Sequence, residues 1–224
     1  MRTRLTAPAT LVAAALLLTA CGGGPLDGRT GPEVAAAAAD ALEAAGAFHL
    51  SGTISRGGSA TEVDLQLQGQ NAAGTLSLDG HEIELLTVDD AVYVQAPLAF
   101  WRSFGIPDGS AAELENRWVI VPADAAAGFQ TFTLAGFVAE IRSPDGEVED
   151  EVSSTEVDGD DAVVVSLEDG SSLAVLDDDP SYPVALTNDE GGSSGTLTIS
   201  GFGEEQDITA PSDALDLADV VAGA

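Results

Sequence analysis

Hydrophobic and polar side chains alternate along much of this chain, and this period of two restricts its fold more than any other feature. In segment 62–68, Val63, Leu65 and Leu67 alternate with acidic and amide side chains. Successive side chains of an extended strand point to opposite faces, so this segment has one buried and one wet face. The same pattern recurs in short runs at 48–54, 76–78, 83–85, 92–94, 163–167, 173–175, 184–186 and 197–199, and segment 148–157 is a further strand candidate. The chain is therefore predicted to consist mainly of amphipathic strands.

Turn-forming residues separate these runs. Gly57-Gly58 and Asp79-Gly80 divide early runs, and segments rich in Asp, Gly and Ser divide later ones. Short strands joined by tight turns favour an antiparallel sheet in chain order. About ten strands in one sheet cannot stay flat, because the twist between neighbours accumulates. We therefore expect an α+β fold, a strongly curved antiparallel half-barrel of about ten strands with helices packed on its concave face.

A helix is predicted just before the strand-rich region. Thr30 and Glu33 have the spacing of a capping box, and Pro32 suits a first helical turn. The helix should run over 32–45 and end at Gly46. Its apolar residues are mostly alanines on one modest face, which is enough to lie against a larger body.

The segment 96–144 interrupts the strand pattern and contains both tryptophans and most phenylalanines of the chain. Pro122 and Pro144 bracket a helical stretch in which Gly128 predicts a break. On a helix, its large apolar side chains spread around most of the circumference, so the helix must be covered on several sides. The concave face of a curved sheet offers that cover, and these helices are expected to fill it.

The N-terminal segment has the pattern of an export signal. Arg2 and Arg4 precede an apolar run that is too short for a settled membrane-spanning helix. The run ends in Leu-Thr-Ala-Cys21, which resembles the lipobox of bacterial lipoproteins, in which the cysteine receives a diacylglyceryl group. Cys21 is the only cysteine, so it has no internal disulfide partner. The alternative is a general secretory signal with an incidental cysteine.

The chain is thus predicted to have three parts. These are a signal peptide over 1–20, the lipidated Cys21 with a flexible tether over 21–31, and a single domain over 32–224. One acyl chain holds a protein to a membrane only reversibly, whereas two give stable attachment. We expect an exported protein anchored to the outer face of the cell membrane.

The charge balance excludes several classes of partner. The chain has 7 Lys and Arg against 38 Asp and Glu, and all seven are arginines. Without Arg2 and Arg4, five basic residues remain against 38 acidic ones, which gives a formal charge of −33. Such a surface repels phosphate backbones and anionic headgroups, which argues against nucleic-acid binding and against attachment through a basic patch. A solvated acidic surface explains the charge better than a specific cation site does.

The sequence patterns do not favour catalysis or metal binding. His49 and His81 are the only histidines, and both are predicted at strand edges. The acidic runs EVEDE, DGDD and LDDDP lack the alternating ligands and central glycine of an EF-hand loop. Residues 191–195 match G-x-S-x-G, but they stand in a polar turn that leads into a strand and not into a helix. We predict a protein that is not an enzyme, without metal or cofactor; binding of cations by the acidic loops stays an open question.

Three segments together resemble a known family. They are AVYVQAPLAFWRSFG (91–105), NRWVIVP (116–122) and the Phe-rich helix that follows, inside the meander and behind the lipobox. The arrangement resembles the LppX/LprA/LprF/LprG lipoproteins of actinobacteria, which are similar in architecture to the periplasmic carrier LolA. The resemblance implies a LolA-like half-barrel around an apolar cavity, and a protein that binds or moves acylated lipids or glycolipids. Arg102 and Arg117 are the basic residues near the expected mouth, and they are the candidates for a contact to a lipid phosphate. A surface ion pair is the alternative role for each.

Apolar residues of the sheet and of the helices are the candidate walls of this cavity. They are Leu65, Leu67, Leu76, Leu78, Ile83, Leu85, Val92, Phe100, Trp101, Phe104, Phe129, Phe132, Phe137 and Ile141. Whether these side chains line a cavity or fill one another stays open, because most apolar residues belong to the core.

The predicted function follows from the anchor and from the resemblance. The protein is expected to bind acyl chains such as palmitate and to carry or present the lipid at the cell envelope. A transporter is a candidate partner, and short, charged edge strands favour a monomer. The alternative is a cell-surface structural or interaction lipoprotein with a filled core and no lipid cargo.

Overall fold

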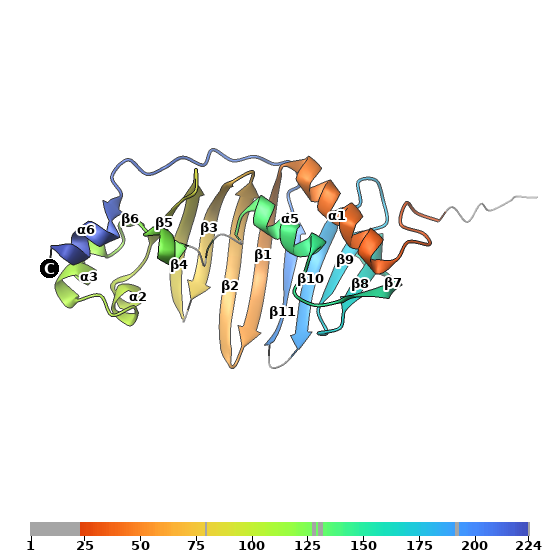
Figure 1. Ribbon diagram of the computed structural model, residues 1–224, viewed down its shortest axis with the longest axis horizontal. Helices are drawn as coiled ribbons and strands as arrows, with labels where there is room; N and C mark the ends of the chain where they lie inside the picture. Colours follow the sequence, from red (N-terminus) through yellow and green to blue (C-terminus); the bar gives the residue numbers. More distant parts are fainter. Residues whose placement is uncertain (1–22, 79, 127–128, 130–131, 191–192, 224) are drawn as a thin grey trace, which may run out of the picture.

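The computed structural model of the chain shows an open, curved sheet with helices across one face (Figure 1). It describes residues 23–78, 80–126, 129, 132–190 and 193–223. The predicted signal peptide and Cys21 lie outside the described residues. Among the helices that are described, none is both long enough and apolar enough to cross a membrane.

The sheet is built from two successive antiparallel meanders. The first contains β1 (Ala47–Arg56), β2 (Ser59–Gln68), β3 (Asn71–Leu78), β4 (His81–Val88), β5 (Ala91–Gln95) and β6 (Trp118–Ile120). The second contains β7 (Val148–Val157), β8 (Asp160–Leu167), β9 (Ser172–Leu176), β10 (Pro183–Glu190) and β11 (Ser193–Ser200). With a short β12 (Leu215–Asp216), the described residues form one sheet in the order β12-β6-β5-β4-β3-β2-β1-β11-β10-β9-β8-β7. The predicted α+β half-barrel is confirmed.

The sheet departs from chain order at its centre, contrary to the expectation from the short turns. The first strand, β1, pairs with β11, so that Leu50 lies opposite Ile199. Gly195 in this seam has a φ of 156°, and a Cβ there would clash with the carbonyl oxygen of Thr53. Glycine allows the two backbones to approach and the sheet to bend. A pairing between the two ends of the strand-rich region leaves no local pattern, so the turns alone did not predict it.

The first helix, α1 (Gly31–Ala45), confirms the predicted helix and begins one residue earlier. The backbone N–H of Thr30 donates to Glu33 Oε2 at 2.9 Å, as a capping box requires. This hydrogen bond lowers the pKa of the Glu33 carboxyl below its ordinary value of 4.5. Gly46 ends the helix with a φ of 73°, a left-handed conformation that suits glycine.

The described part of the chain contains five further helices, all shorter than α1. They are α2 (Leu98–Ser103), α3 (Asp108–Leu114), α4 (Ala123–Ala126), α5 (Leu134–Arg142) and α6 (Leu217–Ala222). The stretch predicted between Pro122 and Pro144 therefore contains two helices, α4 and α5, while Gly128 lies outside the described residues. Helices of this length are marginal in isolation, so packing must hold them in place.

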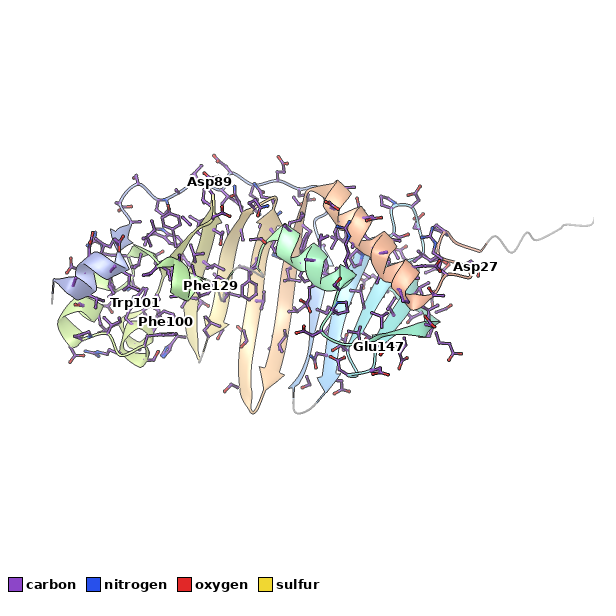
Figure 2. All side chains as sticks on the ribbon, viewed as in Figure 1. Asp27, Asp89, Phe100, Trp101, Phe129 and Glu147 are labelled. Carbon is purple, nitrogen blue, oxygen red and sulfur yellow. The ribbon has the colours of Figure 1, made fainter. Side chains whose placement is uncertain are left out.

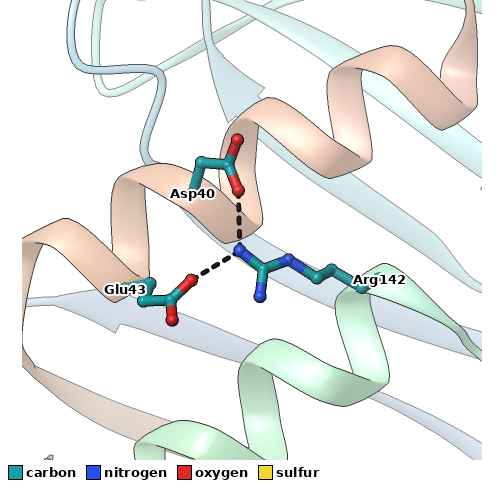
Figure 3. A network of polar contacts seen from close by, with 3 residues as sticks. All are labelled: Asp40, Glu43 and Arg142. Atoms are coloured by element: carbon teal, nitrogen blue, oxygen red, sulfur yellow. Dashed lines mark hydrogen bonds and ion pairs between the residues drawn. The ribbon is translucent and has the colours of Figure 1, made fainter.

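Helices α1 and α5 lie against each other across the sheet (Figure 1). Arg142 of α5 donates to Asp40 Oδ1 at 2.6 Å and to Glu43 Oε2 at 2.5 Å, both on α1 (Figure 3). The hydrogen bonds to Asp40 and then to Glu43 raise the pKa of the Arg142 guanidinium. The ring centroids of Phe137 on α5 and Phe48 on β1 are 5.2 Å apart. Polar contacts to α1 and an aromatic contact to the sheet thus fix α5.

The inward side chains form two hydrophobic clusters. The central core contains Leu42, Phe48, Leu65 and Leu67, each fully buried, together with inward residues of β3 to β5. The lateral core lies under α1 and is formed by Leu26, Val34, Ala38, Val163, Val165, Leu173 and Val175. Leu26 falls within the predicted tether, yet it is 1% exposed and its N–H donates to Asp177 Oδ1 at 2.8 Å. The predicted tether therefore touches the folded part at this residue.

The segment 201–214 runs along one end of the strands from β11 to β12 (Figure 1). Gln66 Nε2 donates to the carbonyl of Glu204 at 2.7 Å, and Gln68 exchanges hydrogen bonds of 2.8 and 2.7 Å with the backbone of Gln206. Leu215 of β12 then pairs in parallel with Val119 of β6. The C-terminal helix α6 is thereby returned to the β6 edge of the sheet.

Candidate functional site

A first cavity lies between β5 and the short helices α2, α4 and α6, and we call it the apolar cavity. Its volume is about 130 Å³. It is lined by Val94, Phe100, Trp101, Phe104, Ile106, Val121, Ala125, Phe129 and Leu217. Every one of these side chains is apolar apart from the indole N–H of Trp101. A ligand that fits here must present hydrocarbon to almost the whole wall.

Phe100 and Trp101 of α2, with Phe104 directly after the helix, build one side of the apolar cavity. Figure 2 shows Phe100 and Trp101 at α2. The Phe100 ring lies 5.2 Å from Trp101, edge to face, and 4.8 Å from Phe104. Such arrangements are favoured by the ring quadrupoles. Phe104 is 63% exposed, so it forms the rim of the cavity. An exposed aromatic beside an apolar opening gives a fatty chain its first contact surface.

The chain turns back after α2, so that Ile106 also reaches the apolar cavity. Gly105 has a φ of 77°, which favours glycine at this turn. The N–H of Ile106 then donates to the carbonyl of Trp101 at 3.2 Å. This turn returns Ile106 to the wall that Trp101 has already formed.

A second cavity lies between α1, α5 and the strands β7 to β10, and we call it the mixed cavity. Its volume is about 340 Å³. It is lined by Ala35, Phe137, Glu140, Ile141, Pro144, Asp145, Gly146, Val148, Val165, Leu167, Asp169, Ser171, Leu173, Leu186 and Asn188. Three carboxylates lie in this wall. The mixed cavity is therefore much more polar than the apolar cavity, and it is also larger.

The structure divides the predicted wall residues into three groups. Phe100, Trp101, Phe104 and Phe129 come together in the apolar cavity. Phe137 and Ile141 line the mixed cavity. The remaining eight pack in or against the central core and are not among the residues that line either cavity: Leu65, Leu67, Leu76, Leu78, Ile83, Leu85, Val92 and Phe132. The middle of the concave face is thus occupied by the side chains of the protein.

Sequence reasoning missed five residues of the apolar cavity. Val94 continues the alternation of Val92 on the same face of its strand, so the period of two was sufficient to find it. Ile106 and Val121 lie in short connections, and Ala125 lies in the four-residue helix α4; each pattern is too brief to assign a face. Leu217 arrives through the long segment from β11, and no local signal indicates that contact.

The polar residues singled out from the sequence do not form a reactive group. Arg102 donates to Asp108 Oδ1 at 2.8 Å with both side chains largely exposed, and Arg117 is exposed. His49 Nε2 lies 3.0 Å from Asp64 Oδ1, and the His81 ring lies 6.5 Å from Phe100. Over the described ranges, no group of three or more His, Cys, Asp or Glu side chains is placed to hold a metal. Residues 191–192 of the G-x-S-x-G match lie outside those ranges.

Comparison with known proteins supports the fold. No family model matches the sequence, and no curated protein matches it. The crystal structure of LprF from Mycobacterium bovis is similar, with 14% sequence identity, a TM-score of 0.53, and coverage of 82% of this chain and 99% of that chain. The lipoprotein LppX from Mycobacterium tuberculosis is similar with 11% identity, a TM-score of 0.51, and coverage of 80% and 99%. The chain therefore has the LppX/LprF fold that the resemblance predicted.

Proposed function

We propose that this protein is an envelope lipoprotein that binds an acyl chain of a lipid or glycolipid in the apolar cavity. The observation that carries the proposal is the wall of that cavity, which consists of nine apolar side chains and has an exposed phenylalanine at its rim. An acyl chain is the biological ligand whose surface matches such a wall. The shared fold with a protein described as a lipoprotein, LppX, supports the same conclusion.

The size of the cavity sets how much of the chain it holds. A cavity of roughly 150 Å³ accommodates one benzene-sized molecule. The apolar cavity, at about 130 Å³, therefore accepts a short end of a fatty chain as it stands. A longer chain requires its walls to separate. Three of those walls are the short helices α2, α4 and α6, which are not strands of the sheet and move at lower cost.

The free energy of transfer explains why such a protein needs no energy source. Burying a sixteen-carbon chain from water is favourable by roughly 13 kcal/mol, at about 0.8 kcal/mol per methylene. The same chain is already dry in a bilayer, so its transfer from membrane to cavity is close to neutral. The cavity shields the lipid during passage, and exchange proceeds in both directions.

The anchor and the location belong to the same proposal. A diacylglyceryl group on Cys21 attaches the protein to the outer face of the membrane, and residues after it carry the folded domain, 32–224, above the lipid surface. The acidic surface requires this anchor, because 38 acidic residues repel anionic headgroups. The protein acts as a monomer that receives or presents lipid, and a transporter is its candidate partner.

One observation favours the alternative of an interaction lipoprotein without cargo. Eight of the predicted wall residues fill the middle of the concave face, and the apolar cavity is small. If the short helices do not separate, the protein offers only its surface to partners.

Lipid extraction distinguishes the two functions. The full chain carrying Cys21→Ser, which cannot be acylated at this position, is purified without detergent and extracted with organic solvent. Mass spectrometry of the extract is expected to find a stoichiometric glycerolipid, and the delipidated protein is expected to take up a fluorescent fatty chain. A protein that carries no lipid and refuses the fluorescent chain contradicts the proposal.

A further inference from the structure

The indole nitrogen of Trp101 is a buried donor without an acceptor. Trp101 is 3% exposed and lines the apolar cavity, and its Nε1 has no hydrogen-bond partner. Buried indole N–H groups usually have a partner, because an unmet donor in a dry site is costly. Thr87 Oγ1 is the other such atom among the described side chains, but Thr87 is not in the wall of either cavity.

The described residues around Trp101 do not supply the missing acceptor. The other wall residues of the apolar cavity have hydrocarbon side chains. A water molecule needs two or more polar partners to stay in such a place, and apolar cavities of this kind remain dry. The acceptor that suits Nε1 is therefore one that a ligand brings with its hydrocarbon.

The charge of the site selects the kind of acceptor. Among the described residues, no basic one lines the apolar cavity, and Arg102 next to Trp101 is already paired with Asp108. A carboxylate in a dry site needs a cation, so the anion of a free fatty acid is disfavoured. A neutral ester carbonyl accepts one hydrogen bond and carries no charge to compensate.

We propose that the apolar cavity selects ester-linked acyl lipids, whose carbonyl oxygen accepts a hydrogen bond from Trp101 Nε1. This inference rests on the proposed function and names its ligand class. Nε1 is covered in this structure, so contact requires the walls of the apolar cavity to move apart as the chain enters. The same separation makes room for the methylenes that a cavity of about 130 Å³ does not hold.

A matched pair of ligands tests the hydrogen bond. The full chain with Cys21→Ser is titrated with dioctanoylglycerol, its ether analogue dioctylglycerol, and octanoate, each in competition with a fluorescent fatty chain. The ester is expected to bind about tenfold more tightly than the ether, as one buried hydrogen bond to an otherwise unpaired donor allows. Octanoate is expected to bind more weakly than the ester at neutral pH.

Two variants assign the preference to one tryptophan. Trp101→Phe is expected to bring the ratio of ester to ether affinity close to one. Trp118→Phe, the same substitution at the other tryptophan, is expected to keep the ratio. NMR of the protein with both tryptophans present gives a readout that does not depend on either variant. The indole N–H resonance of Trp101 should shift when the ester is added and not when the ether is added.

The outcomes separate the inference from the function on which it rests. Equal binding of ester and ether, an unchanged ratio in Trp101→Phe, or tightest binding of octanoate overturns the ester selection and leaves acyl binding in place. If none of the three ligands displaces the fluorescent chain, the ester selection and the assignment of the apolar cavity both fail. If the fluorescent chain itself does not bind, the proposed function fails.

Discussion

The apolar cavity and the mixed cavity lie toward opposite edges of one sheet and are built by different means. The apolar cavity is enclosed by three short helices and one strand, and its wall is hydrocarbon. The mixed cavity is enclosed by α1, α5 and strands β7 to β10, and Glu140, Asp145 and Asp169 stand in its wall. The larger volume belongs to the cavity that suits an acyl chain less. Under the proposed function, we therefore expect wall chemistry, and not volume, to decide which cavity receives an acyl chain.

The two cavities also differ in how firmly the helices that cover them are held in place. The cover of the mixed cavity is α5, and the cover of the apolar cavity includes α2 and α6. Arg142 links α5 to α1 through two carboxylates, and Phe137 packs on Phe48, so the cover of the mixed cavity is held at both sides. At the apolar cavity, α6 is held by the short pairing of the preceding strand β12 with β6 and by its own contact with α3. We therefore expect the apolar cavity to open more easily than the mixed cavity.

The largest expected effect concerns the central core that separates the two cavities. Leu65→Ala should lower the free energy of unfolding by about 2–5 kcal/mol, because Leu65 is fully buried among close-packed neighbours. Leu217→Ala at the wall of the apolar cavity should cost about 1 kcal/mol, because one side of Leu217 already faces space. Urea unfolding measures both. Equal losses of unfolding free energy in the two variants would mean that the central core is as loosely packed as the wall of the apolar cavity.

A matched pair of substitutions tests which cavity binds the chain. Val94 lines the apolar cavity and Val165 the mixed cavity, and each is 1% exposed on a strand. Val94→Phe should reduce the affinity for a fluorescent fatty chain at least tenfold, because the ring occupies the space of the ligand. Val165→Phe should change the affinity by less than about twofold. The reverse ranking would assign binding to the mixed cavity.

A smaller effect is expected at the cover of the mixed cavity. Arg142→Met keeps the length of the side chain and removes the ion pairs to Asp40 and Glu43. Because these groups are largely exposed, hydrogen exchange should quicken modestly in α5 and stay unchanged in α2. High salt should produce part of the same change in the unsubstituted protein. Faster exchange in α2 would show that the two covers are coupled.

The smallest effect is expected at the start of α1. The hydrogen bond from Thr30 lowers the pKa of Glu33 in the folded state, so its stabilisation is present above pH 4.5 and is lost as pH falls through the lowered pKa. Thermal unfolding of Glu33→Gln should therefore approach that of the unsubstituted protein in acid and lie below it at neutral pH. A difference that grows as pH falls would have the wrong sign for a capping carboxylate.

The local elements could be predicted from the sequence, whereas their long-range arrangement could not. Alternation identified strands such as β2 and β9, and the capping box at Thr30 identified α1, because each pattern lies within one element. The pairing of β1 with β11 and the return of α6 depend on contacts between segments far apart in the chain. No period or turn within either segment specifies them.

The same distinction between local patterns and long-range packing applies to the candidate site. The aromatic residues Phe100 and Trp101 of α2 and Phe104 directly after it could be predicted because they cluster in one short segment, and the structure places them together. Leu65 and Leu67 have the same apolar pattern as true wall residues, and only packing distinguishes a filled position from a lined one. That packing depends on Leu42, Phe48 and other central-core residues contributed by α1 and the first meander.

The most direct test of acyl binding in the apolar cavity is photo-crosslinking. A fatty chain with a diazirine at its terminal carbon is bound to the Cys21→Ser chain, irradiated, and its attachment sites are mapped by mass spectrometry. The account predicts attachment to α2, α4, β5 and α6, at or beside Phe104, Phe129 and Leu217. Attachment to the walls of the mixed cavity, between Glu140 and Leu186, or no specific attachment, would contradict it.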